Sequence, residues 1–462
     1  MVLALFHSRL HPSWKGSAGD NSAEVDRKED SLGVIPPENK LDEEIRHTPS
    51  TTRHAMQGPD DADTAAQLKA NVLACSTNDP SKIHDFTDGL CDFIFYTTEK
   101  SYVNTRPGLP FREDDFLVHH LRIKAASSTS TAFGIDVTAE FRQQSLNDLQ
   151  TPEGKHVVEG NWKSKVRSYA ALDVRVSREE ESNTHIVIKF LKKLKAMQAV
   201  LTKDADIGYI FLGVIIESMN GSARDALSSQ QRFQRNESNE DERHHFFNKI
   251  LREVEPHAVV FVTTYRKYYA GAEDSISRYG SVLPFTTPSV WNTSAVSEQP
   301  TFVDTLAFWS ALDNVPGVPV MFSFSVAGRV CRPLNVQKLW TGNNVTGLCT
   351  TTSPGFITDY QICENSNIHS GTLDGYNVQE SLWNHAAGTL IGYDSNITMK
   401  KKMCSVFADY GFRGGWMLYD IEFMEKIPPC DIMVEKSESY YPVHFVKRIL
   451  KGLHTDCAQL PI

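Results

Sequence analysis

Short apolar runs, each of a length that suits one buried strand, alternate with helical segments through most of this 462-residue chain. A strand that is apolar on both faces is typical of a parallel sheet covered by helices, and Tyr209–Glu217 is an almost continuous example. His185–Leu201, by contrast, places its apolar residues on one helical face and its lysines on the other. Eight such strands separated by helices predict an α/β protein, a (β/α)8 TIM barrel, rather than an open doubly wound sheet. The expected strands span residues 71–75, 91–96, 132–137, 209–217, 257–264, 282–287, 318–328 and 415–421.

The composition and the motifs argue against several other classes of protein. Lys plus Arg number 47 against 57 Asp plus Glu, a net charge of −10, whereas a nucleic-acid-binding protein would show a concentrated basic surface. No apolar run reaches eighteen residues, so no membrane span is expected. No Gly-x-Gly-x-x-Gly follows the first strand, and no CxxC or Cys/His cluster has the spacing of zinc ligands. We therefore expect neither a cofactor nor a metal.

Composition also divides the chain into parts. Residues 1–65 are rich in charged and small polar residues and cannot bury enough surface to offset their ordering entropy, so we expect a disordered tail. Residues 66–455 form the expected barrel domain, and residues 456–462 form a short C-terminal tail. The apolar residues before His7 are too few for the core of a signal peptide.

The most informative stretch runs from residue 388 to residue 430. It reads as a helix followed by a strand, because Asp394-Ser395-Asn396 can cap a helix start and Gly411 stands where a left-handed residue ends a helix. Gly414-Gly415 then leads into an apolar strand that ends in acidic groups. The stretch resembles the end of the family 18 glycoside hydrolases, the chitinases and chitinase-like lectins. The matching positions are Gly414, Gly415, Met417 and Asp420, with Tyr419 in place of the family's tryptophan and Glu422 in place of its second aspartate.

The resemblance carries expectations for the insertion and the cysteines. It implies a small α+β insertion between the seventh strand and the last helix, at about residues 331–390, which forms one wall of a sugar cleft. Tyr360-Gln361-Ile362-Cys363 resembles a family motif whose cysteine pairs with one just after the final strand. The family pattern therefore implies Cys75–Cys91 and Cys363–Cys430. Cys331–Cys349 and Cys404–Cys457 remain as pairs by elimination, although sequence alone does not fix connectivity.

The family's catalytic signature, three aspartates and a glutamic acid on the fourth strand, looks degraded here. Glu217 aligns with the glutamic acid that protonates the glycosidic oxygen, but the aspartate positions fall on Ile210, Gly213 and Ile215. Without a neighbouring carboxylate nothing orients the substrate's own acetamido nucleophile, and general acid catalysis alone contributes only ~10²–10⁴-fold. Residues 283–289 also lack the family's sixth-strand tyrosine. We therefore expect a protein that has lost hydrolase activity and keeps Glu217 as a vestige.

Three functional hypotheses follow from the resemblance. In the first, the protein binds chitin or N-acetylglucosamine oligosaccharides through Tyr419, Asp420, Trp416 and Asp136, because an aromatic ring can pack against the apolar face of a sugar. Trp291 and Trp383, in expected loops, could extend the groove. In the second, the protein is a divergent active hydrolase in which Glu217 is the general acid and Asp136 assists. In the third, Tyr419, Phe324 and Trp416 fill the cleft and the barrel is a scaffold for an extracellular protein partner.

The environment expected for the protein is oxidising and secretory. Eight cysteines are an even number, and five Asn-x-Ser/Thr sequons offer sites for N-glycosylation. The sequon asparagines are Asn220, Asn236, Asn292, Asn344 and Asn396. We expect an extracellular, disulfide-bonded glycoprotein.

Overall fold

The computed structural model describes most of the chain after residue 67. The described ranges are 68, 71–83, 85–98, 110–112, 115–176, 181–202, 207–216, 229–264, 302–312, 317–331, 356–357, 368–374, 379–384, 388–424 and 440–457. The expected disordered tail 1–65 and the expected strand 282–287 lie outside these residues. The expected C-terminal tail 456–462 begins inside a helix that ends at Cys457.

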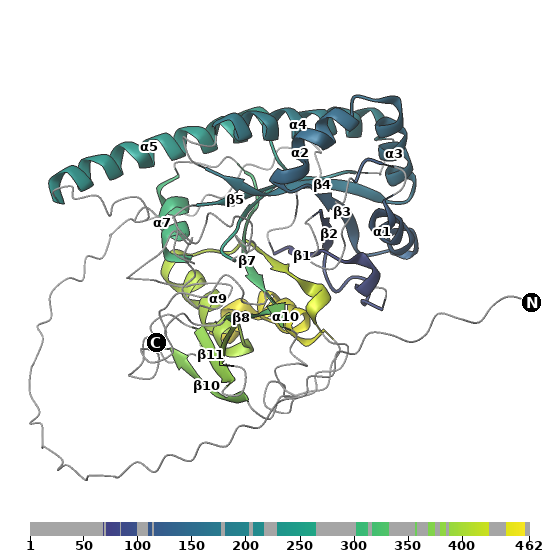
Figure 1. Cartoon of the computed structure of the whole chain (residues 1–462). Coiled ribbons are helices and arrows are strands. Elements are labelled where there is room, and N and C mark those ends of the chain that lie inside the picture. Colours follow the sequence, from purple (N-terminus) through teal and green to yellow (C-terminus); the bar gives the residue numbers. More distant parts are fainter. Residues whose placement is uncertain are drawn as a thin grey trace, which may run out of the picture. The chain divides into compact units, whose positions relative to one another are not determined.

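Eight parallel strands form a closed barrel in the order β1-β13-β7-β6-β5-β4-β3-β2, and helices cover its outside (Figure 1). The barrel strands are β1 (Leu73–Thr77), β2 (Phe93–Thr97), β3 (Ala132–Asp136), β4 (Val166–Arg175), β5 (Ile210–Ile215), β6 (Ala258–Phe261), β7 (Val320–Ser325) and β13 (Gly415–Tyr419). This arrangement confirms the (β/α)8 fold class predicted from the alternation of apolar runs and helices.

The barrel strands differ from the prediction at two places, because β4 was missed and the eight strands that close the barrel do not include the expected sixth strand, 282–287. β4 (Val166–Arg175) was not expected, because its polar residues and its alanines lack the enrichment in β-branched residues that marks a strand in sequence. The apolar run at Ile210–Ile215 is therefore the fifth barrel strand, and Ala258–Phe261 is the sixth. The predicted assignment of the fourth strand to residues 209–217 is wrong.

Helices begin and end where local chemistry predicts. Asp115 caps α1 (Phe116–Ser127) by accepting hydrogen bonds from the amides of Leu117 (2.9 Å) and Val118 (3.0 Å), and Ser395 caps α9 (Asn396–Tyr410). Gly411 ends α9 with a φ of +63°, a left-handed conformation that favours glycine. The helices are α1 (Phe116–Ser127), α2 (Ala139–Asp148), α3 (Pro152–Lys163), α4 (Glu181–Leu201), α5 (Ser229–Val254), α7 (Phe302–Ala311), α9 (Asn396–Tyr410) and α10 (Tyr441–Cys457), with short 3-10 turns η1 (Pro80–Ile83) and η4 (Ile421–Phe423).

Alternation along each strand divides the buried side chains into two cores. One core fills the interior of the barrel, and the other lies between the strands and the surrounding helices. In β13, Met417 and Tyr419 belong to the inner core, whereas Trp416 and Leu418 belong to the outer one. The inner core consists of Val72, Ala74, Phe93, Phe95, Ala170, Leu172, Phe211, Ala258, Val260, Val262, Met321, Met417 and Tyr419.

Glycine is required where β13 begins. A Cβ added to Gly414 would collide with the backbone oxygen of Val320, and one added to Gly415 would come within 2.5 Å of the backbone oxygen of Val72. The two neighbouring strands therefore approach β13 too closely for any side chain at these positions.

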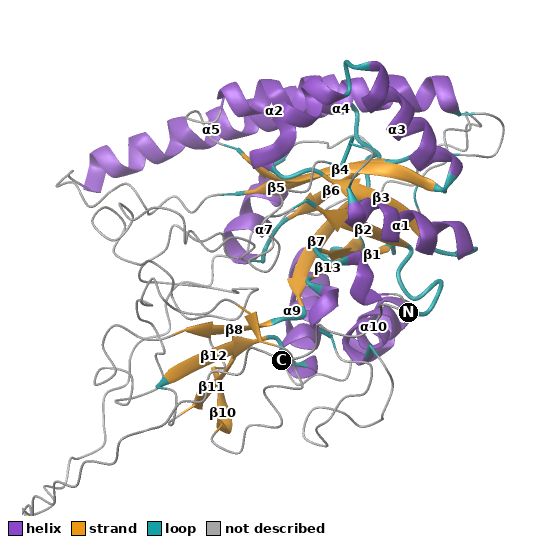
Figure 2. Ribbon diagram, turned by 45° about the vertical axis from the view of Figure 1, so that its right-hand side comes forward, coloured by secondary structure: helices purple, strands orange, loops and turns teal. Residues whose placement is uncertain are grey.

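The insertion between β7 and α9 contains a five-stranded antiparallel sheet in the order β10-β11-β12-β8-β9 (Figure 2). Its strands are β8 (Gly328–Cys331), β9 (Phe356–Ile357), β10 (Ile368–Asp374), β11 (Gln379–Asn384) and β12 (Thr389–Tyr393). Trp383 was expected in a loop but lies on β11, where it pairs with Leu390 on one side and His369 on the other.

Two disulfides join described residues, and both are pairs expected from the sequence. Cys75 is bonded to Cys91 with a Cα–Cα distance of 6.1 Å, and Cys404 is bonded to Cys457 with a Cα–Cα distance of 5.1 Å. The other expected pairs involve Cys349, Cys363 and Cys430, which lie outside the described residues, and Cys331, which ends β8.

Candidate functional site

Chemistry in a (β/α)8 barrel takes place at the C-terminal ends of the strands, so the inward-facing residues there define the candidate site. On β4 the residues in the inner core are Ala170 and Leu172. The acidic residue of β4, Asp173, points instead to α2, where it accepts a hydrogen bond from the amide of Ala139 (2.9 Å) and forms an ion pair with Arg142. β4, which is described over its whole length, therefore places no carboxylate inside the barrel.

Glu217 needs a correction of its role. The family signature lies on the fourth strand, whereas Glu217 follows β5, the fifth strand of the barrel. The alignment of Glu217 with the signature glutamic acid therefore uses the wrong strand. The same holds for the alignment of the signature aspartates with Ile210, Gly213 and Ile215. Glu217 itself lies outside the described residues. The sequence predicted that the signature strand, taken as residues 210–215, lacks its acidic residues. The fourth strand is β4 instead, and its inner face also lacks acidic residues.

Asp136, the last residue of β3, is fully buried and ties three strands together. Its Oδ2 accepts a hydrogen bond from the hydroxyl of Thr97 on β2 (3.0 Å), and its Oδ1 accepts one from the amide of Leu172 on β4 (2.8 Å). It lies two residues after Gly134, whose missing Cβ makes room for the inner-core ring of Phe95. The carboxylate thus faces the barrel interior and supports the ends of β2 and β4.

Tyr419, the last residue of β13, has an exposed fraction of 0% and packs in the inner core. In this conformation its ring is not presented to solvent as the floor of an open sugar site would be. Trp416 lies on the opposite face of β13, because side chains alternate across a strand and the two residues are three positions apart. Its ring stacks on Phe324 of β7 (centroids 4.6 Å apart) and packs near Phe302 of α7.

Trp416 and Phe324 both belong to the outer core. This placement does not support the predicted role of Trp416 in substrate binding, nor the predicted filling of the cleft by the two rings, and both stay predictions. Tyr419 is the one residue of that predicted trio whose side chain lies inside the barrel.

Two carboxylates follow Tyr419 at the mouth of the barrel. Asp420 has a left-handed backbone (φ +68°) and accepts a hydrogen bond from the hydroxyl of Ser325 on β7 (2.5 Å). Glu422 accepts a hydrogen bond at Oε1 from the amide of Asn78, in the loop after β1 (3.1 Å). The two acidic residues therefore fasten the end of β13 to its neighbours on both sides.

Glu422 is the most strongly perturbed group of this rim. The residue as a whole is half-buried, but its Oε2 is shielded from solvent and has no hydrogen-bond partner among the described residues. Burial, together with the nearby charge of Asp420, raises the pKa of Glu422 to about 8. The raised pKa of Glu422 favours its protonated, uncharged form at the rim.

Sequence reasoning missed Thr97 and Ser325, which hold Asp136 and Asp420 in place. Both are hydroxyl residues that end an otherwise largely apolar strand, in the runs FIFYT and VMFSFS. A polar residue at the C-terminal end of a buried barrel strand is the signal that could have identified them.

The remaining predicted features have mixed outcomes. Asn396 is the first residue of α9 and is half-buried, Asn236 lies in α5, and Asn220, Asn292 and Asn344 lie outside the described residues, so glycosylation stays a prediction. Across the described ranges, no three His, Cys, Asp or Glu side chains converge as metal ligands would. None of the described helices combines the length and the apolarity needed to cross a membrane.

Comparisons with known proteins find similar structures but no similar sequence. No family model matches the chain, and no curated protein matches it. Among solved structures, the chain is similar to an immunomodulatory active chitinase from Trichuris suis (13% identity, TM-score 0.51, covering 83% of this chain and 100% of that one). It is also similar to a human pseudo-chitinase with retained chitooligosaccharide binding properties (12% identity, TM-score 0.50, covering 83% and 100%).

A third similar structure is a group IV chitinase from Ostrinia furnacalis in complex with allosamidin (11% identity, TM-score 0.53, covering 83% of this chain and 99% of that one). The structural similarity to these proteins establishes a common fold, and sequence identities this low leave the activity of this chain open. The similarity spans the barrel and nearly the whole of each relative. This chain therefore has the fold of the family 18 chitinases and chitinase-like proteins.

Proposed function

We propose that this protein is a chitinase-like protein that does not hydrolyse chitin and that binds N-acetylglucosamine oligosaccharides at the mouth of its barrel. The observation that carries the loss of hydrolysis is the inner face of β4, where Ala170 and Leu172 stand on the strand that bears the acidic signature in the family. Substrate-assisted hydrolysis needs one carboxylate to orient the acetamido group and a carboxylic acid to protonate the leaving oxygen. An alanine and a leucine can do neither.

The divergent-hydrolase alternative would need Asp136 to assist Glu217. Asp136 accepts a hydrogen bond at each carboxylate oxygen, from Thr97 and from Leu172, so both oxygens take part in holding the strand ends. This arrangement supports a structural role for Asp136. It favours the inactive hypothesis over the divergent hydrolase.

Hydrolysis is tested with a fluorogenic chitotrioside, using an active family 18 chitinase as the positive control. We expect the purified protein to release no more fluorophore than its Glu217→Gln variant. Cleavage by the wild type that falls in Glu217→Gln or Asp136→Asn would contradict the proposal.

Sugar binding rests on the fold shared with a pseudo-chitinase that retains chitooligosaccharide binding. The expected result is retention of the protein on colloidal chitin and its elution by N-acetylglucosamine oligomers. The informative variant is Tyr419→Phe, which removes the inner-core hydroxyl and keeps the ring. Its matched control is Tyr169→Phe, which removes a hydroxyl that is equally buried in the outer core. Tyr169→Phe should leave retention unchanged, and weaker retention of Tyr419→Phe would show that sugar binding exposes the Tyr419 hydroxyl, which is buried in the free protein.

One observation favours a second candidate function, a scaffold for an extracellular protein partner. Tyr419 has no exposed surface, so the inner core of the barrel is closed beneath it. A wild-type protein that folds, yet is not retained on chitin, would support the scaffold and refute the lectin.

A further inference from the structure

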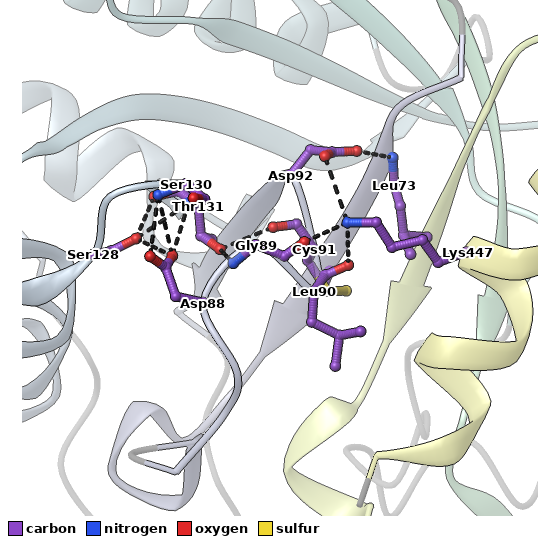
Figure 3. Close-up of polar contacts among 11 residues, drawn as sticks. Leu73, Asp88, Gly89, Leu90, Cys91, Asp92, Ser128, Ser130, Thr131 and Lys447 are labelled. Carbon is purple, nitrogen blue, oxygen red and sulfur yellow. Dashed lines mark hydrogen bonds and ion pairs between the residues drawn. A yellow bond between two sulfur atoms is a disulfide. The ribbon is translucent and has the colours of Figure 1, made fainter. Parts of the chain in front are cut away.

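The C-terminal helix α10 is anchored to the rest of the domain in two chemically different ways. The first anchor is polar, and Figure 3 shows it. The ammonium group of Lys447 donates hydrogen bonds to the backbone oxygens of Gly89 and Leu90 (3.0 Å for Leu90) and lies 3.9 Å from a carboxylate oxygen of Asp92. Lys447 thus holds the middle of α10 against the loop that precedes β2.

That loop is itself fixed, so Lys447 binds to a rigid platform. Asp88 accepts hydrogen bonds from the Ser128 hydroxyl (2.5 Å) and from the amides of Thr129 (2.8 Å) and Thr131 (3.0 Å), in the segment before β3 (Figure 3). These donors hold the pKa of Asp88 well below its usual range, although burial opposes the shift. Cys91, in the same loop, is bonded to Cys75 of β1.

An apolar face adds to the polar anchor over the first part of α10. Side chains at helical spacing lie in the outer core, and most have less than 5% of their surface exposed. These residues are Tyr441, Val443, Phe445, Val446, Ile449 and Leu450. The helix up to residue 450 is therefore held by packing and by Lys447, without a covalent link.

The second anchor is covalent and lies beyond a kink. Gly452 departs from helical geometry (φ −114°, ψ 23°) and separates the packed part of α10 from its last turn. After the kink, Leu453, the one large hydrophobic residue of the last turn, is half-buried and packs against the outer core, and the hydroxyl of the exposed Thr455 donates to the backbone oxygen of Gly452 (2.9 Å). The last turn then ends at Cys457, which is bonded to Cys404 on α9.

We propose that the Cys404–Cys457 disulfide is a redox-sensitive latch that holds the last turn of α10 on α9. The kink at Gly452 lets this turn detach while Lys447 and the apolar face keep the remainder of the helix in place. The latch differs in accessibility from Cys75–Cys91, since both of those cysteines have an exposed fraction of 0%. Cys404 has 4% of its surface exposed and Cys457 is half-buried.

The chemistry of opening is thiol–disulfide exchange with a dithiol reductant. One thiolate of the reductant attacks the Cys457 sulfur, forms a mixed disulfide and releases the Cys404 thiolate, which takes up a proton. The second thiol of the reductant then closes a cyclic disulfide and releases the Cys457 thiol. Two electrons and two protons pass to the protein, and the reductant is oxidised.

The test uses the full chain under native conditions with increasing dithiothreitol, followed by alkylation and peptide mass spectrometry. We expect Cys404 and Cys457 to be alkylated at reductant concentrations that leave Cys75–Cys91 intact. Under the same conditions, amide hydrogen exchange should rise about tenfold or more at residues 453–457 and stay unchanged at residues 441–450. Cys457→Ser should show the same exchange pattern without reductant.

Lys447→Met tests the first, polar anchor, with Lys451→Met as the matched control because Lys451 is exposed on the same helix. Reduction of Lys447→Met should extend the rise in exchange to residues 441–450, whereas reduction of Lys451→Met should not. The proposal is overturned if Cys75–Cys91 is reduced first, or if reduction of the wild type leaves exchange at 453–457 unchanged. It is also overturned if reduction of the wild type frees the whole helix.

Discussion

The indole of Trp416 and the phenyl ring of Phe324 stack with an interplanar angle of 3° and a centroid distance of 4.6 Å. The pair lies between the barrel and its helices, where Phe302 and Phe412 also contact the indole ring. An aromatic cluster of this kind stabilises the packing of α7 against β7 and β13. It has no access to the barrel mouth.

Replacing Trp416 by alanine should therefore lower stability without removing a ligand contact. We expect a loss of about 3–5 kcal/mol in the free energy of unfolding, because a large buried ring is replaced by a cavity. Chemical denaturation measures the loss. Phe116→Ala is the control, since this ring is 66% exposed and its removal should change stability by no more than about 0.5 kcal/mol. Unchanged stability in Trp416→Ala would contradict the outer-core placement.

The Thr97–Asp136 hydrogen bond should contribute to stability as a coupled pair. Asp136→Asn should cost about 1–3 kcal/mol, because one buried donor then meets an amide nitrogen instead of an acceptor. A double-mutant cycle with Thr97→Val should give a coupling energy of about 0.5–3 kcal/mol. In the control cycle, Asp136→Asn is combined with Thr87→Val in place of Thr97→Val. Thr87 is exposed, and its coupling energy with Asp136 should be near zero. Equal coupling in both cycles would refute the contact.

Glu422 should make the protein less stable as the pH rises. Its pKa is about 8 in the folded chain against an ordinary value of 4.5, so the folded state retains a proton that the unfolded state loses. The stabilisation is then complete below about pH 4.5 and is lost as the pH rises toward 8. Glu422→Gln removes the titrating group and should flatten this part of the profile.

Unfolding by denaturant at several pH values between 4 and 9 gives the difference between wild type and Glu422→Gln. The difference should shift in favour of the variant as the pH rises through this window. A difference that does not change with pH would show that Glu422 is not shielded as the structure has it.

The buried ion pair at the start of α9 should be sensitive to the loss of one partner. Lys402 lies 2.6 Å from Asp394, and both side chains have an exposed fraction of 0%. Lys402→Met would leave the Asp394 carboxylate buried and without its cation, at a cost of about 3–5 kcal/mol. Adding Asp394→Leu to Lys402→Met should recover part of this loss in thermal or chemical unfolding.

The matched control is the surface pair of Lys192 and Glu253, whose side chains are 51% and 39% exposed. Lys192→Met should change stability by no more than about 1 kcal/mol, because solvent screens an exposed pair. Equal losses in Lys402→Met and Lys192→Met would contradict the burial of the first pair.

The sequence by itself determined the features that depend on neighbouring residues. The alternation of apolar runs and helices indicated the eight-stranded barrel, and the stretch from Ser395 to Tyr419 indicated the capped helix, its glycine end and the last strand. The family pattern indicated the Cys75–Cys91 bond. The barrel, the helix and the strand follow from periodicity and capping, which are local, whereas the disulfide follows from the resemblance to the family.

The tertiary structure decided which strand bears the site and what each candidate residue does. β4 has no strong signal of its own, and pairing with β3 and β5 on either side makes it a strand. The partners of Asp136 come from β2 and β4, and the environment of Glu422 comes from β1 and from Asp420. Hydrogen-bond partners and burial at the barrel mouth are set by residues far apart in the chain. For that reason, only the closed barrel could separate the inner Tyr419 from the outer Trp416 and show that β4, not the run at residues 210–215, is the fourth strand.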